Sequence, residues 1–331
     1  MEIKATDVAK LRKMTGAGMM DCKKALVEAE GDFEKAKEII REKGKLVAAK
    51  RADRETTEGS VIAKVLEGNQ KAILVSLGCE TDFVAKNDEF TALANAIAEV
   101  AATAYPATKE DLLACKMADG RTVEQAVTEQ TGKSGEKHVV ACYYTLEAPY
   151  IGSYIHINHK IATVVGFNKE VPADLAKHIA MQITAMNPVA VNSDSVPAEV
   201  VEKELAIAIE KTKEEQILKA VEADLKKAGI NPAHVDSEDH IQSNTAKGWI
   251  TPEQADLARQ IIKETSEKKA ANLNEGMIQN IAKGRLAKFF KEQTLEDQEF
   301  VMVGKISVKD HIASIDKDAK VVAFQRFSLT D

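Results

Sequence analysis

The sequence is poor in the residue patterns that build most catalytic and metal sites. It contains no phosphate-binding loop of the Walker type and no dinucleotide-binding glycine fingerprint. Aromatic residues make up only 5% of the chain. Four cysteines lie far apart without a paired metal-ligand spacing, namely Cys22, Cys79, Cys115 and Cys142. We therefore expect reduced, buried thiols of a cytosolic protein, and no bound metal or cofactor.

Clustered positive charge and long apolar runs are scarce too. Lysine and arginine number 45 against 52 aspartates and glutamates, which gives a net charge of −7. Because phosphate binding needs clustered basic side chains, we expect no direct nucleic-acid partner. The sequence has no stretch of ~18 apolar residues to span a bilayer and no apolar signal core after Met1. The chain is thus predicted to be cytoplasmic, without a membrane partner.

At 331 residues with 44% hydrophobic residues, the chain can form two or three compact domains. Apolar spacing over residues 1–43 predicts three short helices, the first capped by Thr6 and Asp7. The charged residues 44–58 are predicted to form a linker.

Two adjacent methionines, Met19 and Met20, begin the second predicted helix. Neighbouring positions on a helix cannot both point into one core, so we expect at least one of them on the surface. A flexible thioether suits a binding surface, although packing in the bundle is the alternative.

The rest of the chain carries one pattern twice. In each copy a glycine-led strand is followed by an apolar strand, an amphipathic helix, a glycine-containing turn and a final strand. The paired segments are 59–62 and 152–155, 73–75 and 161–165, 90–100 and 175–183, 120–123 and 304–308, and 139–142 and 321–324. We expect an α+β fold with a pseudo-repeated core of two small antiparallel sheets backed by helices.

The second copy contains a long insertion at about 197–300. Apolar residues recur with helical spacing after Pro197, after Pro252 and from Met277 onwards, and a polar stretch containing Trp249 separates the first two runs. Their many glutamates and lysines predict an antiparallel coiled-coil hairpin.

The two copies differ at the connection between the second strand and the helix. The first copy uses the longer segment 78–88, which contains Thr81, Asp82 and Phe83, whereas the second uses only 167–172. Because the second copy closes without the extra residues, we favour a functional role for them. In the structural alternative, Asp82 caps a helical turn and Phe83 packs onto the sheet.

Candidate catalytic groups lack the neighbours that catalysis needs. Cys79 ends an apolar strand with no base nearby in the sequence, so we expect a structural thiol rather than a nucleophile. His156 and His159 lie in a predicted hairpin turn, but no cysteine or carboxylate cluster joins them as metal ligands. The sequence therefore favours a binding protein without catalytic residues of its own.

Two motifs, in this order, resemble bacterial elongation factor Ts. The first comprises Leu11, Arg12 and residues 15–26, TGAGMMDCKKAL, and the second is residues 79–86, CETDFVAK. A third stretch, GSYIH at residues 152–156, is also similar to the family. The resemblance covers nearly the whole chain.

That resemblance implies an N-terminal ubiquitin-associated-like three-helix domain with its linker over residues 1–55. A pseudo-repeated core would follow, with one half over 56–147 and the other, holding the coiled-coil hairpin, over 148–331. It also implies a guanine-nucleotide exchange factor for elongation factor Tu in translation elongation. The expected partner is elongation factor Tu, GDP-bound and nucleotide-free, and the complex could form a dimer of heterodimers.

By the same resemblance, three surfaces would contact that partner. The N-terminal bundle of this chain would contact the partner's GTPase domain through Arg12, Met19, Met20 and Lys23. A second surface would contact that domain near the partner's bound magnesium, through Thr81, Asp82, Phe83 and Val84. His156 would contact another part of the partner. The alternative function is a non-catalytic adaptor, with the bundle as its peptide-binding unit and the hairpin as a spacer.

Overall fold

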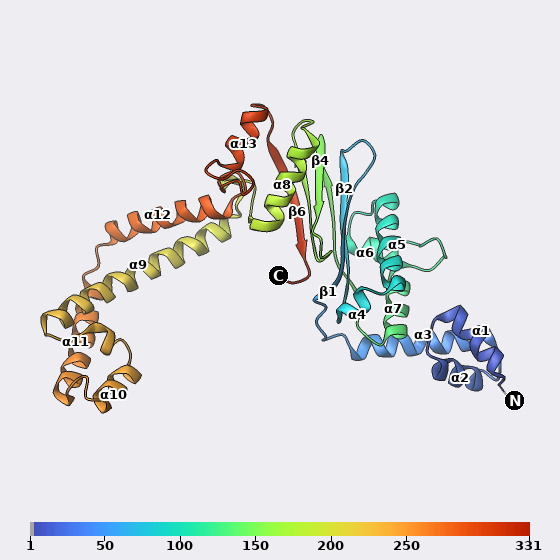
Figure 1. The fold of residues 1–331 in the computed structure, drawn as a ribbon, viewed down its shortest axis with the longest axis horizontal. Helices are drawn as coiled ribbons and strands as arrows, with labels where there is room; N and C mark the ends of the chain where they lie inside the picture. Colours follow the sequence, from blue (N-terminus) through green and yellow to red (C-terminus); the bar gives the residue numbers. More distant parts are fainter. Residues whose placement is uncertain (1–2) are drawn as a thin grey trace. The chain divides into compact units, whose positions relative to one another are not determined.

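A computed structural model describes residues 3–331 and confirms the expected α+β class with two small antiparallel sheets (Figure 1). The sheets have the strand orders β1-β2-β3 and β4-β5-β6. The strands are β1 (Glu58–Val65), β2 (Lys71–Cys79), β3 (Val139–Glu147), β4 (Tyr150–Ile155), β5 (Ile161–Phe167) and β6 (Val321–Ser328). The chain divides into two compact units. One runs up to Val191 and resumes over Glu299–Asp331, and the other is Asn192–Gln298.

The two sheets are built alike. Each central strand, β2 or β5, is apolar and buried on both faces, which explains its continuous rather than alternating pattern. The register shifts between Ser76 and Leu77 in one sheet and between Gly166 and Phe167 in the other. One apolar cluster joins the two sheets face to face, and its members include Val61, Leu74, Leu146, Ile151 and Val164.

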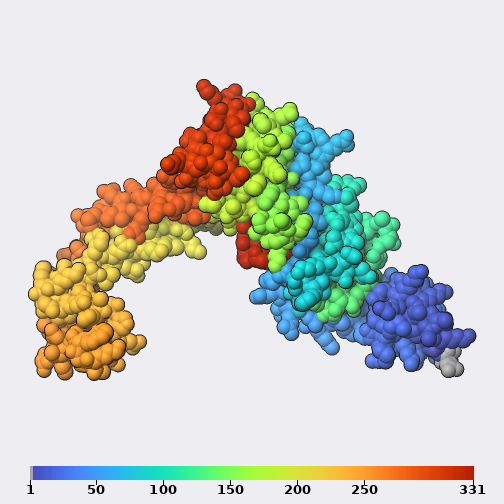
Figure 2. Space-filling view, viewed as in Figure 1, coloured from blue at the N-terminus to red at the C-terminus, as the bar shows by residue number. Residues whose placement is uncertain are grey.

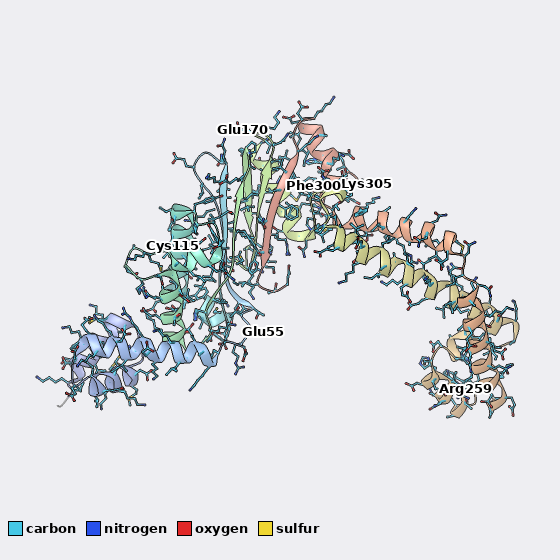
Figure 3. The ribbon with its side chains drawn as sticks, turned by 180° about the vertical axis from the view of Figure 1, so that it is seen from behind. Glu55, Cys115, Glu170, Arg259, Phe300 and Lys305 are labelled. Carbon is cyan, nitrogen blue, oxygen red and sulfur yellow. The ribbon has the colours of Figure 1, made fainter. Side chains whose placement is uncertain are left out.

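Helices cover the outer faces of both sheets. Those between β2 and β3 are α4 (Asp82–Ala85), α5 (Asp88–Ala104), α6 (Lys109–Ala114) and α7 (Val123–Ser134). In the first compact unit, which holds both sheets, α8 (Ala173–Met186) and α13 (Val308–Ile315) lie between β5 and β6. A Cβ atom on Gly152 of β4 would lie 2.6 Å from the Cβ of Ala176, so α8 can approach this strand only at glycine. Phe300, labelled in Figure 3, stacks on His311 of α13 with 4.3 Å between ring centroids.

The two glycine-containing turns also match. Thr122 and Ser307 are the N-caps of α7 and α13, and each accepts a hydrogen bond from a backbone amide of the helix that it starts. Each cap residue also forms an isolated β-bridge, Thr122 with Lys116 and Ser307 with Glu299.

The N-terminal segment forms α1 (Ala5–Thr15), α2 (Met19–Glu28) and α3 (Phe33–Lys50) around one apolar cluster. Gly16 ends α1 with a φ of 70°, a left-handed conformation that glycine adopts without strain. The prediction that Thr6 and Asp7 cap α1 is wrong. The N-cap is Lys4, and its side chain makes no capping hydrogen bond.

The linker predicted over residues 44–58 is also wrong in its first half, because α3 continues to Lys50. Charged side chains on this stretch are exposed, whereas Gly44 is buried against α7. A Cβ atom on Gly132 of α7 would lie only 2.8 Å from the Cα of Gly44. The two backbones thus pack directly on each other, and a run of charges that suggested a linker is one face of a packed helix.

The second unit is helical and carries its own apolar core. Its elements are η1 (Ser193–Ser195), α9 (Ala198–Lys227), η2 (Pro232–His234), α10 (Glu238–Ala246), α11 (Pro252–Ala271) and α12 (Glu275–Gln293). α9 and α12 lie side by side (Figure 2), and Arg285 of α12 pairs with Glu215 of α9 at 2.6 Å. The predicted polar stretch contains α10, which is tied to α11 by the ion pair of Glu238 with Arg259. Arg259 is labelled in Figure 3. None of the helices formed by residues 3–331 combines the length and hydropathy needed to cross a membrane.

Candidate functional site

The candidate site begins where the buried strand β2 ends. Cys79 is fully buried in the apolar cluster beneath α5, and its Sγ contacts the Thr81 carbonyl oxygen at 3.3 Å. Burial raises the pKa of the Cys79 thiol to about 12, and the nearby carboxylates of Glu136 and Glu58 add to the effect. The thiol is therefore protonated at neutral pH, which agrees with a structural role rather than a nucleophilic one.

Glu80 turns away from the strand and is held by two other parts of the chain. Its two carboxylate oxygens each lie 2.8 Å from Nη1 of Arg51, which follows α3, and one also accepts from the Lys137 amide at 2.6 Å. Burial alone would raise the pKa of Glu80, but the Lys137 amide and Arg51 outweigh burial and lower it. The side chain is thus a fixed anion with both of its oxygens occupied.

Thr81 is held by Glu136, a residue that lies just after α7. One carboxylate oxygen of Glu136 accepts from the Thr81 hydroxyl at 2.7 Å, and the other accepts from the Thr81 amide at 3.1 Å. Thr81 is the N-cap of α4, yet its side chain makes no capping hydrogen bond to that helix. Its hydroxyl is used instead to fasten the start of α4 to the core.

The next three residues point in different directions. Phe83 is 85% exposed, whereas Val84 is partly buried and packs against the apolar cluster of the first sheet. Asp82 pairs with Lys86 one turn later at 2.6 Å, and this contact lowers the pKa of its carboxyl. The segment therefore exposes an aromatic ring and a carboxylate, while Glu80, Thr81 and Val84 hold it to the core.

The structural alternative for this segment fails in both of its parts. Asp82 is the first residue of α4 rather than its cap, and Phe83 does not pack onto the sheet. A large apolar side chain this exposed has no role in the core of the free protein. Exposed aromatics of this kind typically mark contact surfaces.

His156 lies in the turn between β4 and β5, as predicted, and is half-buried. Its Nδ1 lies 3.3 Å from the Tyr154 hydroxyl. The adjacent Ile157 is 86% exposed, and our sequence analysis did not select it. An isoleucine between polar residues at a predicted hairpin turn was the signal that could have found it.

The β4–β5 turn, residues 156–160, and the Phe83 segment, residues 80–86, lie at the same end of the two-sheet core. β1 begins at Glu58, which is opposite Cys79 in the register. Glu58 also pairs with Lys160, and the Val61 amide donates to the carbonyl of His159 at 2.7 Å. The fold thus brings together two candidate surfaces, at Phe83 and at His156, that are more than seventy residues apart in the sequence.

The N-terminal candidates form a separate surface. Arg12, Met19, Met20 and Lys23 are all exposed, with Met20 65% and Met19 44% accessible. At least one methionine was expected on the surface, and both are there. The two methionines start α2, where Asp21 pairs with Lys43 of α3, whereas the Phe83 segment is held by Arg51, which follows α3. The N-terminal candidates thus lie on the three-helix cluster, and Phe83 lies on α4.

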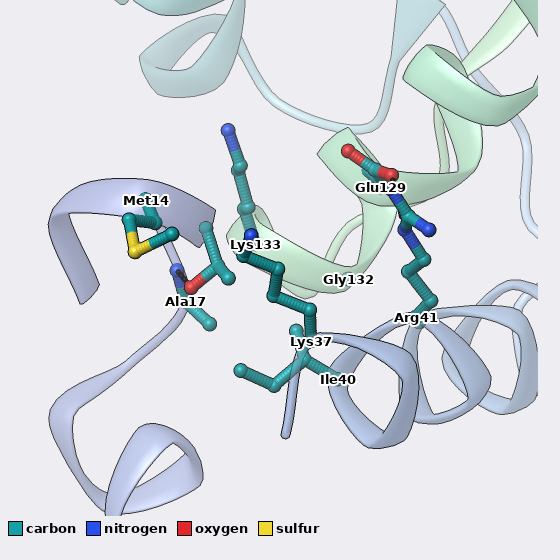
Figure 4. Close-up of a pocket in the computed structure, with 10 residues that line it drawn as sticks. Met14, Ala17, Lys37, Ile40, Arg41, Glu129, Gly132 and Lys133 are labelled. Carbon is teal, nitrogen blue, oxygen red and sulfur yellow. Dashed lines mark hydrogen bonds and ion pairs between the residues drawn. The ribbon is translucent and has the colours of Figure 1, made fainter. Parts of the chain in front are cut away.

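A small cavity lies where the N-terminal bundle contacts α7 (Figure 4). Lys133 reaches from α7 toward the turn after α1, and a Cβ atom on Gly16 would lie 2.6 Å from its Cε. Arg41 of α3 pairs with Glu129 of α7 at 3.3 Å on the other side of this junction. The cavity thus belongs to a packed junction inside the first unit, and its lining offers no nucleophile–base pair.

Residues 3–331 contain no group of three or more histidines, cysteines or carboxylates placed to hold a metal ion. Within these residues, no third metal-binding side chain therefore joins His156 and His159 in the β4–β5 turn.

Comparison with known proteins gives a consistent result. The family described as Elongation factor TS matches residues 80–331. Relatives named Elongation factor Ts are 55% identical in Bacteroides fragilis and 52% identical in Bacteroides thetaiotaomicron, over 330 residues and 99% of both chains. The relative of that name in Porphyromonas gingivalis is 40% identical over 329 residues, again 99% of both chains. Together with the two motifs and the doubled sheet, these matches show that the chain belongs to the elongation factor Ts family.

Proposed function

We propose that this chain binds elongation factor Tu and accelerates release of its GDP during translation elongation. Membership in the elongation factor Ts family supports the partner and the process. The observation that carries the mechanism is Phe83, a ring that is 85% exposed on a segment fastened to the core at Thr81. The protein works in the cytoplasm and needs no catalytic residue of its own.

The mechanism rests on thermodynamic linkage. A protein that speeds nucleotide release must bind the nucleotide-free partner more tightly than the GDP-bound one, and GDP must weaken its binding by the same factor. In a GTPase, GDP is held by a phosphate-binding loop and a magnesium ion. Any group that displaces those elements on binding therefore favours release.

In this proposal Phe83 supplies that displacement. Its ring is inserted into the partner's GTPase domain near the magnesium site and exchanges water for apolar contacts. Asp82 accompanies it, since its exposed pairing with Lys86 is weak enough to be exchanged for new partners. Thr81 and Val84 hold the segment to the core, because Thr81 is bound to Glu136 and Val84 packs on the apolar cluster of the first sheet.

The other two surfaces supply affinity. The N-terminal surface is proposed to contact the GTPase domain through Arg12, Met19, Met20 and Lys23. His156, with Ile157 beside it, is proposed to contact a different part of the partner. The complex forms with both nucleotide-free and GDP-bound partner, and it could assemble as a dimer of heterodimers.

The test is the rate of GDP release from elongation factor Tu loaded with a fluorescent GDP analogue, with and without this protein. Acceleration that saturates with protein concentration supports exchange. Binding without acceleration would instead identify an adaptor and contradict the proposal.

A further inference from the structure

The Phe83 segment cannot hold its own shape. α4 has only four residues, Asp82–Ala85, and helices this short are not stable in isolation because nucleation costs more than one turn returns. Three backbone hydrogen bonds close the turn, from Ala85 to Thr81, from Lys86 to Asp82 and from Asn87 to Val84. The direction in which Phe83 points must therefore be set by contacts outside the helix.

Val84 and Ala85 supply some of those contacts by packing on the apolar cluster of the first sheet, and the polar ones hold Glu80 and Thr81 from two distant segments. Arg51 and the Lys137 amide occupy the Glu80 carboxylate, and Glu136 binds both the amide and the hydroxyl of Thr81. The side chain of Glu80 is only 16% accessible, and that of Arg51 is 36% accessible. Removing one partner would leave a largely buried carboxylate or amide unpaired, which is more costly than losing an exposed contact.

The two distant segments are also joined to each other. The Lys137 ammonium donates to the carbonyl oxygens of Ala52 and Arg54 at 2.7 and 2.9 Å. The residues after α3, the residues after α7 and the start of the Phe83 segment therefore form one closed network. None of these contacts involves the exposed face of Phe83.

We propose that Arg51, Glu80 and Glu136 are positioning residues that fix the orientation of Phe83 before the partner arrives. This inference rests on the proposed exchange function. The physical reason is pre-organisation: a ring already held in its binding orientation loses less entropy on insertion than one on a mobile loop. The network acts through Phe83, so its effect on the rate of GDP release disappears when the ring is absent.

A double-mutant cycle tests this dependence. GDP release from elongation factor Tu is measured against concentration for the full-length wild type, Arg51→Met, Phe83→Ala and the double variant. Glu136→Gln, alone and with Phe83→Ala, forms a second cycle, because its amide nitrogen replaces one of the two acceptors of Thr81. Lys50→Met is the matched control, since it removes a neighbouring exposed cation that is outside the network.

We expect Arg51→Met and Glu136→Gln each to lower the maximal release rate by about threefold or more, within the range of measured pair couplings. The half-saturating concentration should change little, because the N-terminal surface is intact. In the Phe83→Ala background both substitutions should have almost no further effect. Thermal unfolding should show that all variants are folded, and Lys50→Met should match the wild type.

The other outcomes each overturn the inference in a recognisable way. If Phe83→Ala slows release but Arg51→Met and Glu136→Gln do not, the network does not position the ring, and the exchange proposal stands. If their effects add fully to that of Phe83→Ala, they act independently of the ring, which also overturns the inference. If Phe83→Ala releases GDP at the wild-type rate, the wedge fails and the positioning role fails with it.

Discussion

Replacing Phe83 by alanine should slow stimulated GDP release at least about tenfold without unfolding the protein. An aromatic side chain offers roughly 150–250 Å² for burial. Since Phe83 is 85% exposed, nearly all of that area is free to be buried in a partner. At about 25 cal/mol per Å², this corresponds to about 3–5 kcal/mol if burial is complete.

The measured loss should be smaller than that figure. Alanine keeps part of the contact, and an interface converts area into affinity incompletely. We expect about 2 kcal/mol, which is close to 30-fold in rate or affinity. The free energy of unfolding should change by less than about 0.5 kcal/mol, because the ring makes little contact with its own core.

The assay is stopped-flow release of a fluorescent GDP analogue from elongation factor Tu, at fixed magnesium and over a range of protein concentrations. Leu218→Ala is the control, since it removes another exposed apolar side chain, 56% accessible, from the second unit. Equal release rates for Phe83→Ala and wild type, with both folded, would refute the reasoning.

Three further predictions concern affinity, packing and pH. Replacing Met19 and Met20 together by alanine should raise the half-saturating concentration on the order of tenfold while leaving the maximal rate unchanged; substitution is preferable to deleting residues 1–50 because α3 also packs on α7. Gly132→Ala should lower the free energy of unfolding by about 1–3 kcal/mol in thermal or urea melts, because its Cβ would lie 2.8 Å from the Cα of Gly44; Gly284→Ala in α12, where the Cβ meets no atom within 4 Å, should be neutral or stabilising. His138 is buried, its Nε2 has no hydrogen-bond partner within residues 3–331, and burial lowers its pKa below the ordinary 6.5. The unfolded chain therefore takes up the proton first, and stability should fall as pH drops below about 6.5, with that part of the dependence absent in His138→Gln.

The sequence predicted the doubled sheet well because its signals are local. Apolar runs at residues 73–75 and 161–165 mark the central strands, and all of their residues except the half-buried Ile161 are buried in their sheets. The exposed position of Phe83 was predicted only indirectly, from the extra length of the connection that holds it. Its actual exposure depends on whether a neighbouring element covers it, which no local pattern records.

The anchoring contacts could not be predicted from the sequence. Glu136 lies 55 residues from Thr81, and no spacing rule links them. Arg51 stood in a charged stretch that resembles a linker, although α3 continues to Lys50 directly before it. Its pairing with Glu80 follows from where α3 ends in space, and that is fixed by the close packing of Gly44 on Gly132.

The central claim is that this chain binds nucleotide-free elongation factor Tu in preference to the GDP-bound form. Titration calorimetry with both forms, at the same magnesium concentration, measures that preference directly. The account predicts tighter binding to the nucleotide-free form, by the same factor by which this protein weakens GDP binding. Equal affinity for the two forms would contradict it.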